Sequence, residues 1–93
     1  MKSLPTILTT MESALMKQYK DLKGRYCNCV LLFRVGDFYE AFEEDAEVLA
    51  TLGHRLVETD THKLAGFREY KLNAELTKLI KAGHRVATVT RIG

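Results

Sequence analysis

The fold of this chain is decided by the stretch Val30-Leu31-Leu32-Phe33-Arg34-Val35-Gly36-Asp37-Phe38-Tyr39-Glu40-Ala41-Phe42. It begins with consecutive apolar residues, which is typical of a strand buried on both faces. The run breaks at Gly36, and Asp37 followed by Glu40 matches a helix N-cap with a capping box. The sequence therefore predicts a strand over 29–35 that passes through Gly36 into a helix over about 38–52. Such a junction lies at an edge of the sheet, where ligands tend to bind.

Two interpretations of Phe38 fit this pattern. In the first, Phe38 heads the buried face of the helix and Glu40 only caps it. The apolar residues at helical spacing are Phe38, Phe42, Ala46, Leu49 and Leu52. In the second, the helix begins after Phe38, and Phe38 and Glu40 project outward as an aromatic wedge beside a carboxylate. Spacing alone does not choose between the two.

Length and composition indicate one small globular domain. The chain has 93 residues, of which 46% are hydrophobic and 28% charged, and its formal net charge is +2. This charge permits nucleic acid as a partner without requiring it. We expect a loose tail over 1–8 and a single domain over 9–93. The sequence has no apolar run long enough for a membrane span and no signal-peptide pattern at its start, so we expect a cytoplasmic location and no membrane partner.

The remaining sequence alternates helix and strand patterns. Thr9 and Glu12 predict a helix start, and Gly24 its end. Short strands over 55–58 and 63–66 are predicted to form a hairpin, followed by a third helix ending at Gly83 and a strand over 85–92. The pattern predicts an α/β fold, a small mixed sheet with about three packed helices. The residues expected in the core are Leu31, Phe33, Phe42, Leu49, Leu76, Ile80 and Val89.

Signs of catalysis or metal binding are weak. The sequence contains no phosphate-binding loop and no nucleophile with a recognisable local context, so we expect neither an enzyme nor a cofactor. Cys27 and Cys29 are too few for a zinc site unless histidines converge on them. The acidic run Glu43, Glu44, Asp45 and Glu47 is expected on the exposed side of a helix, where its side chains fan outward.

The run from Phe33 to Ala46 is similar to the signature of the N-terminal domain, domain I, of the MutS family of DNA mismatch-repair proteins. That family carries a Phe-x-Glu motif after Gly-Asp, and Phe38-Tyr39-Glu40 matches it. Further segments follow in the family's order, so the resemblance covers about 10–93. They are Met16-Lys17-Gln18-Tyr19, Leu64-Ala65-Gly66, Leu76-Thr77-Lys78-Leu79 and Ala82-Gly83-His84-Arg85-Val86-Ala87.

The resemblance implies a function in reading DNA. Phe38 would wedge into the duplex from the minor groove and stack on a mispaired base, and Glu40 would hydrogen-bond to the same base. Gly36 would permit a tight strand-to-helix turn, and Tyr39 is assigned to the same DNA-binding motif. The implied partner is duplex DNA with mismatched or unpaired bases, bound weakly by this chain alone, together with other protein domains or subunits. ATP binding belongs to the full-length family proteins only.

The sequence also departs from the family pattern. Phe67-Arg68-Glu69-Tyr70 stands where the family tends to have Ile/Val-Pro-Tyr-His, and Thr90-Arg91 replaces a pair often written Glu-Gln. The connection between Leu56 and Leu64 is shorter than usual. These differences keep an alternative open, a protein-interaction domain that has the fold but does not bind DNA.

Overall fold

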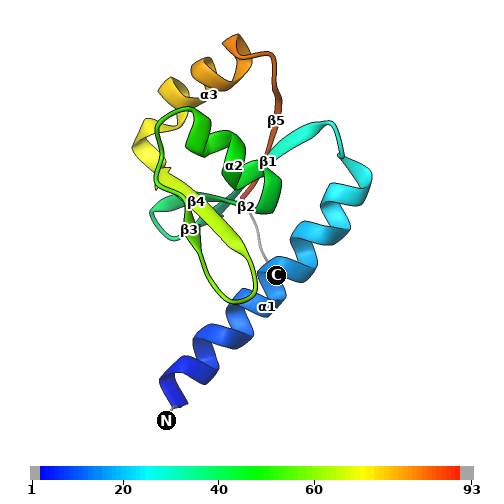
Figure 1. Ribbon diagram of the computed structural model, residues 1–93, viewed down its shortest axis with the longest axis vertical. Coiled ribbons are helices and arrows are strands. Elements are labelled where there is room, and N and C mark those ends of the chain that lie inside the picture. Colours follow the sequence, from blue (N-terminus) through cyan, green and yellow to red (C-terminus); the bar gives the residue numbers. More distant parts are fainter. Residues whose placement is uncertain (1–2, 91–93) are drawn as a thin grey trace.

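The chain is built on a five-stranded mixed sheet, of order β3-β4-β2-β1-β5, in a computed structural model that describes residues 3–90 and the side chains of residues 14–90 (Figure 1). The strands are β1 (Cys29–Val35), β2 (Phe38–Phe42), β3 (Val57–Glu58), β4 (Lys63–Arg68) and β5 (Arg85–Val89). The helices are α1 (Ser3–Arg25), α2 (Glu43–Thr51) and α3 (Leu72–Lys81), with a 3-10 turn η1 (Glu69–Lys71) before α3. The predicted α/β class, a small mixed sheet with three packed helices, is confirmed.

The central strand β1 joins two kinds of neighbour. It pairs antiparallel with β2, placing Val35 opposite Phe38, and parallel with β5, placing Leu31 beside Ala87. Alternate residues of β1 serve the two faces of the sheet, because successive side chains of a strand point to opposite sides. Both faces are covered by helices, so every position from Val30 to Phe33 is buried, as the apolar run predicts.

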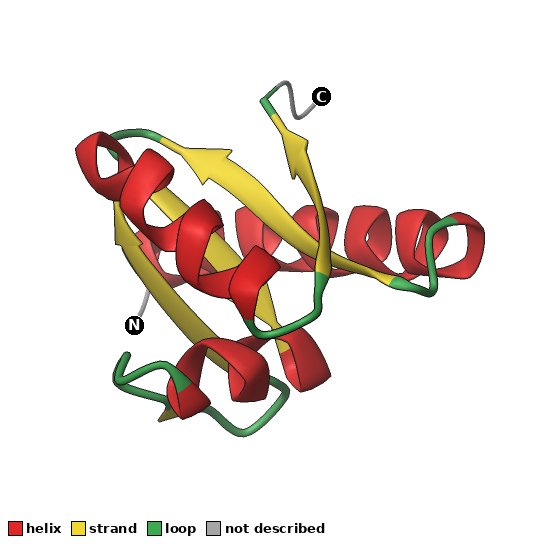
Figure 2. Ribbon diagram, turned by 90° about the horizontal axis from the view of Figure 1, so that it is seen from above, coloured by secondary structure: helices red, strands yellow, loops and turns green. Residues whose placement is uncertain are grey.

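The sheet separates two hydrophobic cores (Figure 2). On one face, α2 and α3 pack on the sheet, and the buried residues are Val30, Leu32, Tyr39, Ala41, Ala46, Leu49, Ala65, Phe67 and Leu79. On the other face, α1 packs on the sheet, and the buried residues are Leu15, Tyr19, Leu31, Phe33 and Phe42. Strands β1 and β2 contribute alternate residues to both cores, so the two cores depend on the same central strands.

Most of the expected core is found buried, with one clear error. Leu31, Phe33, Phe42 and Leu49 are buried, whereas Leu76 and Val89 are only half-buried. The prediction for Ile80 is wrong, because its side chain is 61% exposed. Leu79 takes the inward position of the last helical turn, and the next residue is rotated by about 100° around the helix. The end of the predicted strand over 85–92, including Ile92, lies outside the described residues.

The helix predicted over 38–52 is wrong in its first part. Residues 38–42 form strand β2, and α2 begins only at Glu43, so Asp37 caps no helix and Glu40 lies within a strand. The error has a geometric cause: a spacing of four residues keeps side chains on one face in a helix and also in a strand. The chain bends from β2 into α2 at Glu43, whose φ of 52° lies in the left-handed region that few residues other than glycine adopt.

Helix α1 begins at Ser3, whereas a loose tail was expected over 1–8. Thr9 and Glu12 lie within α1 and not at its start, so the helix start predicted at Thr9 is wrong. None of the helices within residues 3–90 is long and apolar enough to cross a membrane. The predicted hairpin between β3 and β4 is confirmed, and the Thr59 amide donates to the His62 carbonyl across its turn, at 2.8 Å.

A buried ion pair fixes α1 against the start of α2. The Lys23 Nζ lies 2.8 Å from Asp45 Oδ1 and also donates to the Cys29 carbonyl at 2.5 Å. The other carboxylate oxygen of Asp45 accepts the Leu31 amide at 3.1 Å. The prediction that Asp45 is exposed is therefore wrong, since the residue is only 2% exposed. Burial, followed by the nearby Asp45 carboxylate, raises the pKa of Tyr19 above its ordinary value.

A second buried carboxylate ties α3 to the loop after α2. Glu75 is 3% exposed and lies 2.7 Å from His54 Nε2 and 3.2 Å from Lys78 Nζ. Burial alone would raise the pKa of Glu75, but hydrogen bonds from His54 and Lys78 outweigh it and hold that pKa below 4.5, the ordinary value for glutamate. Glu75 therefore stays ionised inside the fold and contributes to its stability.

Candidate nucleic-acid interface

The candidate site begins at the turn between β1 and β2. Because Val35 pairs with Phe38, the turn consists of Gly36 and Asp37 alone. Gly36 has a φ of 60°, and glycine with positive φ at the first central position is the pattern of a type II′ hairpin turn. Gly36 does permit a tight turn, but the turn joins two strands and not a strand to a helix.

The side chain of Phe38 lies at the surface just after this turn. It is 40% exposed, so the interpretation that buries Phe38 at the head of a helix is wrong. Phe38 pairs across the strands with Arg68 of β4, and the Arg68 Cζ lies 5.0 Å from the centroid of the Phe38 ring. The site therefore offers an accessible aromatic ring with a guanidinium group beside it.

Glu40 lies on the same face of the sheet as Phe38, two residues further along β2. It is half-buried and its neighbour across the strands is Gly66. A Cβ at Gly66 would lie 2.6 Å from the Tyr39 carbonyl oxygen and 3.3 Å from the Glu40 Cγ. Gly66 thus leaves the space that the Glu40 side chain occupies.

Tyr39 lies on the opposite face and does not present its ring beside Phe38. It is 5% exposed, and its ring packs at 5.9 Å between centroids on the ring of Phe67. The prediction that Tyr39 contacts DNA alongside Phe38 and Glu40 is therefore not supported for its side chain. Tyr39 and Phe67 instead anchor the strands that carry the exposed residues.

Two arginines flank the turn from opposite faces of the sheet. Arg34 lies over Tyr39, with its Cζ 5.8 Å from the ring centroid, and its Nε donates to the Gly36 carbonyl at 2.6 Å. Arg68 lies over Phe38 on the other face. The Asp37 carbonyl accepts the Glu69 amide at 2.8 Å, which fastens η1 beside the turn. Exposed Phe38 thus has one basic side chain beside it, Arg68, while Arg34 lies on the opposite face of the sheet.

Sequence reasoning missed Arg34, Arg68 and Gly66 as parts of this site. Each belongs to the site only because strand pairing brings it to a residue of β2: Arg34 to Tyr39, Arg68 to Phe38 and Gly66 to Glu40. An isolated arginine or glycine carries no such signal in the sequence. The departure from the family pattern at Phe67-Arg68 was the one visible sign that this part of β4 is unusual.

No metal centre is found among the residues that the structure describes, since no group of three or more suitable side chains converges there. Cys27 is exposed and Cys29 half-buried, and both are free thiols. Two of the three histidines have other side-chain contacts: His54 binds Glu75, and His62 packs edge-on against Phe42.

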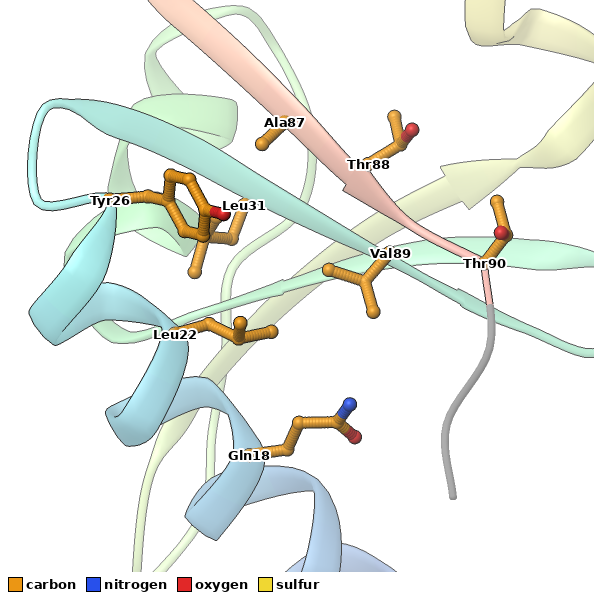
Figure 3. Close-up of a pocket in the computed structure, with 8 residues that line it drawn as sticks. All are labelled: Gln18, Leu22, Tyr26, Leu31, Ala87, Thr88, Val89 and Thr90. Carbon is orange, nitrogen blue, oxygen red and sulfur yellow. The ribbon is translucent and has the colours of Figure 1, made fainter.

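A groove lies between α1 and β5 (Figure 3). Its volume is about 450 Å³, and in Figure 3 Leu22 of α1 and Val89 of β5 point toward each other, whereas the side chains of Thr88 and Thr90 point away from α1. Figure 3 shows no charged side chain among the labelled residues. The groove is therefore a second surface feature, separate from the Phe38 turn.

Comparisons with known proteins agree with the motif. Residues 13–92 match the family model described as MutS domain I. The DNA mismatch repair protein MutS of Flavobacterium johnsoniae is 51% identical over 82 residues, which is 82% of this chain and 9% of that protein. MutS of Pseudothermotoga lettingae is 43% identical over 79 residues, 84% of this chain and 10% of that protein. The chain thus spans about a tenth of the length of these relatives. The predicted resemblance is confirmed, and the chain belongs to the MutS domain I family.

Proposed function

We propose that this chain is a DNA-binding module that reads mispaired or unpaired bases in a duplex. Its relatives are DNA mismatch repair proteins, and the observation that carries the proposal is the 40% exposed Phe38 ring, held next to a tight turn with Arg68 beside it. An exposed ring held by paired backbone is available for insertion into a partner.

Phe38 would act as a wedge. An inserted ring unstacks a base step at a cost of a few kcal/mol, and that cost is least where pairing is already defective. Defective sites would therefore be selected without sequence readout. The turn at Gly36 and Asp37 gives the ring a fixed starting position, because Val35 and Phe38 are paired in the sheet on either side of it.

Glu40 would make the polar contact to the displaced base. A carboxylate near phosphates is repelled by an intact duplex and is tolerated where it meets a donor, or where it is protonated and donates. Glu40 shares its face with Phe38, and Gly66 leaves the room it needs. The two side chains would thus address the same base.

The module would bind DNA without acting on it chemically, and it would bind weakly. With a formal net charge of +2, the chain neutralises few phosphates, and counterion release supplies most of non-specific affinity. Kinking a duplex costs about 1–6 kcal/mol, which a small site offsets poorly. We expect dissociation constants of about 10⁻⁴–10⁻⁶ M at physiological salt, the usual non-specific range.

Titration of labelled homoduplex and single-mismatch DNA tests the proposal. Wild type should prefer the mismatch, Phe38→Ala should lose the preference, and Glu40→Ala should lose more discrimination than affinity. Tyr26→Ala is the matched control, since Tyr26 is an exposed aromatic residue, 49% exposed, beyond the opposite end of β1. It should keep the preference. Identical curves for wild type and Phe38→Ala would refute the wedge, and nanomolar binding would refute the charge argument.

A protein-interaction domain that keeps the fold without DNA binding is the second candidate. The observation that favours it is the groove of about 450 Å³ between α1 and β5, which the DNA-reading proposal does not use. The same titration separates the two functions, because an interaction domain would show no dependence on Phe38.

A further inference from the structure

The guanidinium group of Arg68 covers one face of the Phe38 ring. Its Cζ lies 5.0 Å from the ring centroid, within the distance at which a cation is attracted to an aromatic face. A phenylalanine ring has two faces, so only the opposite one is left for stacking. We propose that Arg68 is a positioning residue of the reading site, holding the Phe38 ring so that it stacks on a base through one face only. This inference rests on the proposed function.

The backbone beneath Arg68 is held by β2, by the core and by the turn. Arg68 is paired with Phe38 in the sheet, whereas β3 pairs only with Lys63 and Leu64, at the other end of β4. The preceding residue, Phe67, is 5% exposed and anchors the strand in the core. The following residue, Glu69, donates its amide to the Asp37 carbonyl of the turn. Both partners of the contact are therefore held on rigid strands, and little order is lost when they meet.

The same position suits contact with DNA. Arginine carries five donors and no acceptor, and the minor groove presents base acceptors and a negative potential that attracts it. If the ring enters from the minor groove, the guanidinium enters beside it. Glu40 lies on the same face of the sheet, one pair further along, opposite Gly66. The positive charge of Arg68 would offset the repulsion between the Glu40 carboxylate and the phosphates.

Arg68→Gln is the test, and Arg85→Gln is its matched control. Arg85 is also an exposed arginine on a strand, but it pairs with Cys29, at the end of β1 opposite Val35. By the rise of a strand it lies about 20 Å from the turn. Both variants remove one positive charge, so the counterion contribution falls alike in both. Both should melt close to wild type, because neither arginine is buried.

The readout is the ratio of dissociation constants for homoduplex and single-mismatch DNA. We expect Arg68→Gln to lower this ratio about two- to five-fold, which is what a cation–π contact at an exposed site contributes. Arg68→Lys should restore part of it, since the charge is kept and the planar fork is lost. Arg85→Gln should weaken both duplexes equally and leave the ratio unchanged.

Failure of the inference and failure of the proposed function look different. If the mismatch preference depends on Phe38 but is the same in Arg68→Gln as in Arg85→Gln, the positioning role alone is overturned. Loss of any Phe38 dependence would overturn both. The contact can also be tested without DNA. In wild type, the ring current of Phe38 should shift the NMR signals of the Arg68 side-chain protons upfield, and Phe38→Ala should abolish this shift. Ordinary shifts in wild type would overturn the contact itself.

Discussion

Replacing Gly66 by alanine should destabilise the chain by about 1–2 kcal/mol, although the change adds only a methyl group. The new Cβ would lie 2.6 Å from the Tyr39 carbonyl oxygen, closer than such atoms approach in proteins. The carbonyl belongs to the backbone of β2, which is paired on both sides, so it has little freedom to withdraw. The Glu40 Cγ, 3.3 Å away, would be pushed as well.

The magnitude follows from two opposing effects. Alanine loses less backbone entropy than glycine on folding, which favours the variant by about 0.5–1 kcal/mol. Overpacking of a well-filled position typically costs about 1–3 kcal/mol, and a contact with backbone belongs to the upper part of that range. The difference is a net loss of about 1–2 kcal/mol, which lowers Tm by roughly 4–16 °C in a domain of this size.

Thermal melts of Gly66→Ala and Gly24→Ala, side by side, check the reasoning. Gly24 lies in α1, and a Cβ there would meet nothing within 4 Å. The same substitution should therefore stabilise by up to about 1 kcal/mol, because alanine is the better helix former. If Gly66→Ala melted at or above the wild-type temperature, the close approach of β4 to β2 would be refuted.

Further predictions concern the cores and the buried carboxylates. Phe42→Ala should cost about 3–5 kcal/mol in urea unfolding, since its ring is 3% exposed and packs edge-on against three other rings. Phe38→Ala should cost only about 1–2 kcal/mol, and equal losses would place Phe38 in the core. Asp45→Ala should cost about 3–5 kcal/mol because it removes the buried carboxylate that accepts from both the Lys23 ammonium group and the Leu31 amide; a wild-type Tm would disprove the ion pair. Because the pKa of Glu75 is lowered in the fold, its contribution to stability is complete above its ordinary pKa of 4.5 and is lost as the pH falls through the lower folded value. Glu75→Gln should therefore lose less unfolding free energy than wild type between pH 7 and pH 3. Parallel curves of stability against pH for the two proteins would contradict this prediction.

The strands and helices that were predicted correctly are those with local signals. The apolar run of β1, the spacing of the leucines in α3 and the turn before β4 each occur within a few neighbouring residues. The strand-to-helix boundary at Glu43 has no such signal. A positive φ is usually signalled by glycine in the sequence, but at the start of α2 it is adopted by Glu43. Gly36 also has a positive φ, but its turn joins two strands. The helix was therefore predicted to start too early.

The candidate site divides in the same way. Phe38 and Glu40 could be found from a motif within one strand, but their neighbours Arg68 and Gly66 are brought to them by the pairing of β2 with β4. The burial of Asp45 likewise depends on Lys23, which is 22 residues away in the sequence. Pairing register and tertiary ion pairs are properties of the folded chain, so a pattern read along the sequence does not contain them.

The parallel pairing of β1 with β5 has a consequence during synthesis of the chain. β2 directly follows β1 and can pair with it through a tight turn, but residues 85–89 are made only after β2, α2, β3, β4 and α3. Parallel contacts between distant segments form slowly, because a long loop must close first. Until then one edge of the apolar strand β1 stays without its neighbour, open to other chains and to proteases. We therefore expect nascent chains that stop before residue 85 to be degraded rapidly and to become resistant to proteolysis once β5 is present.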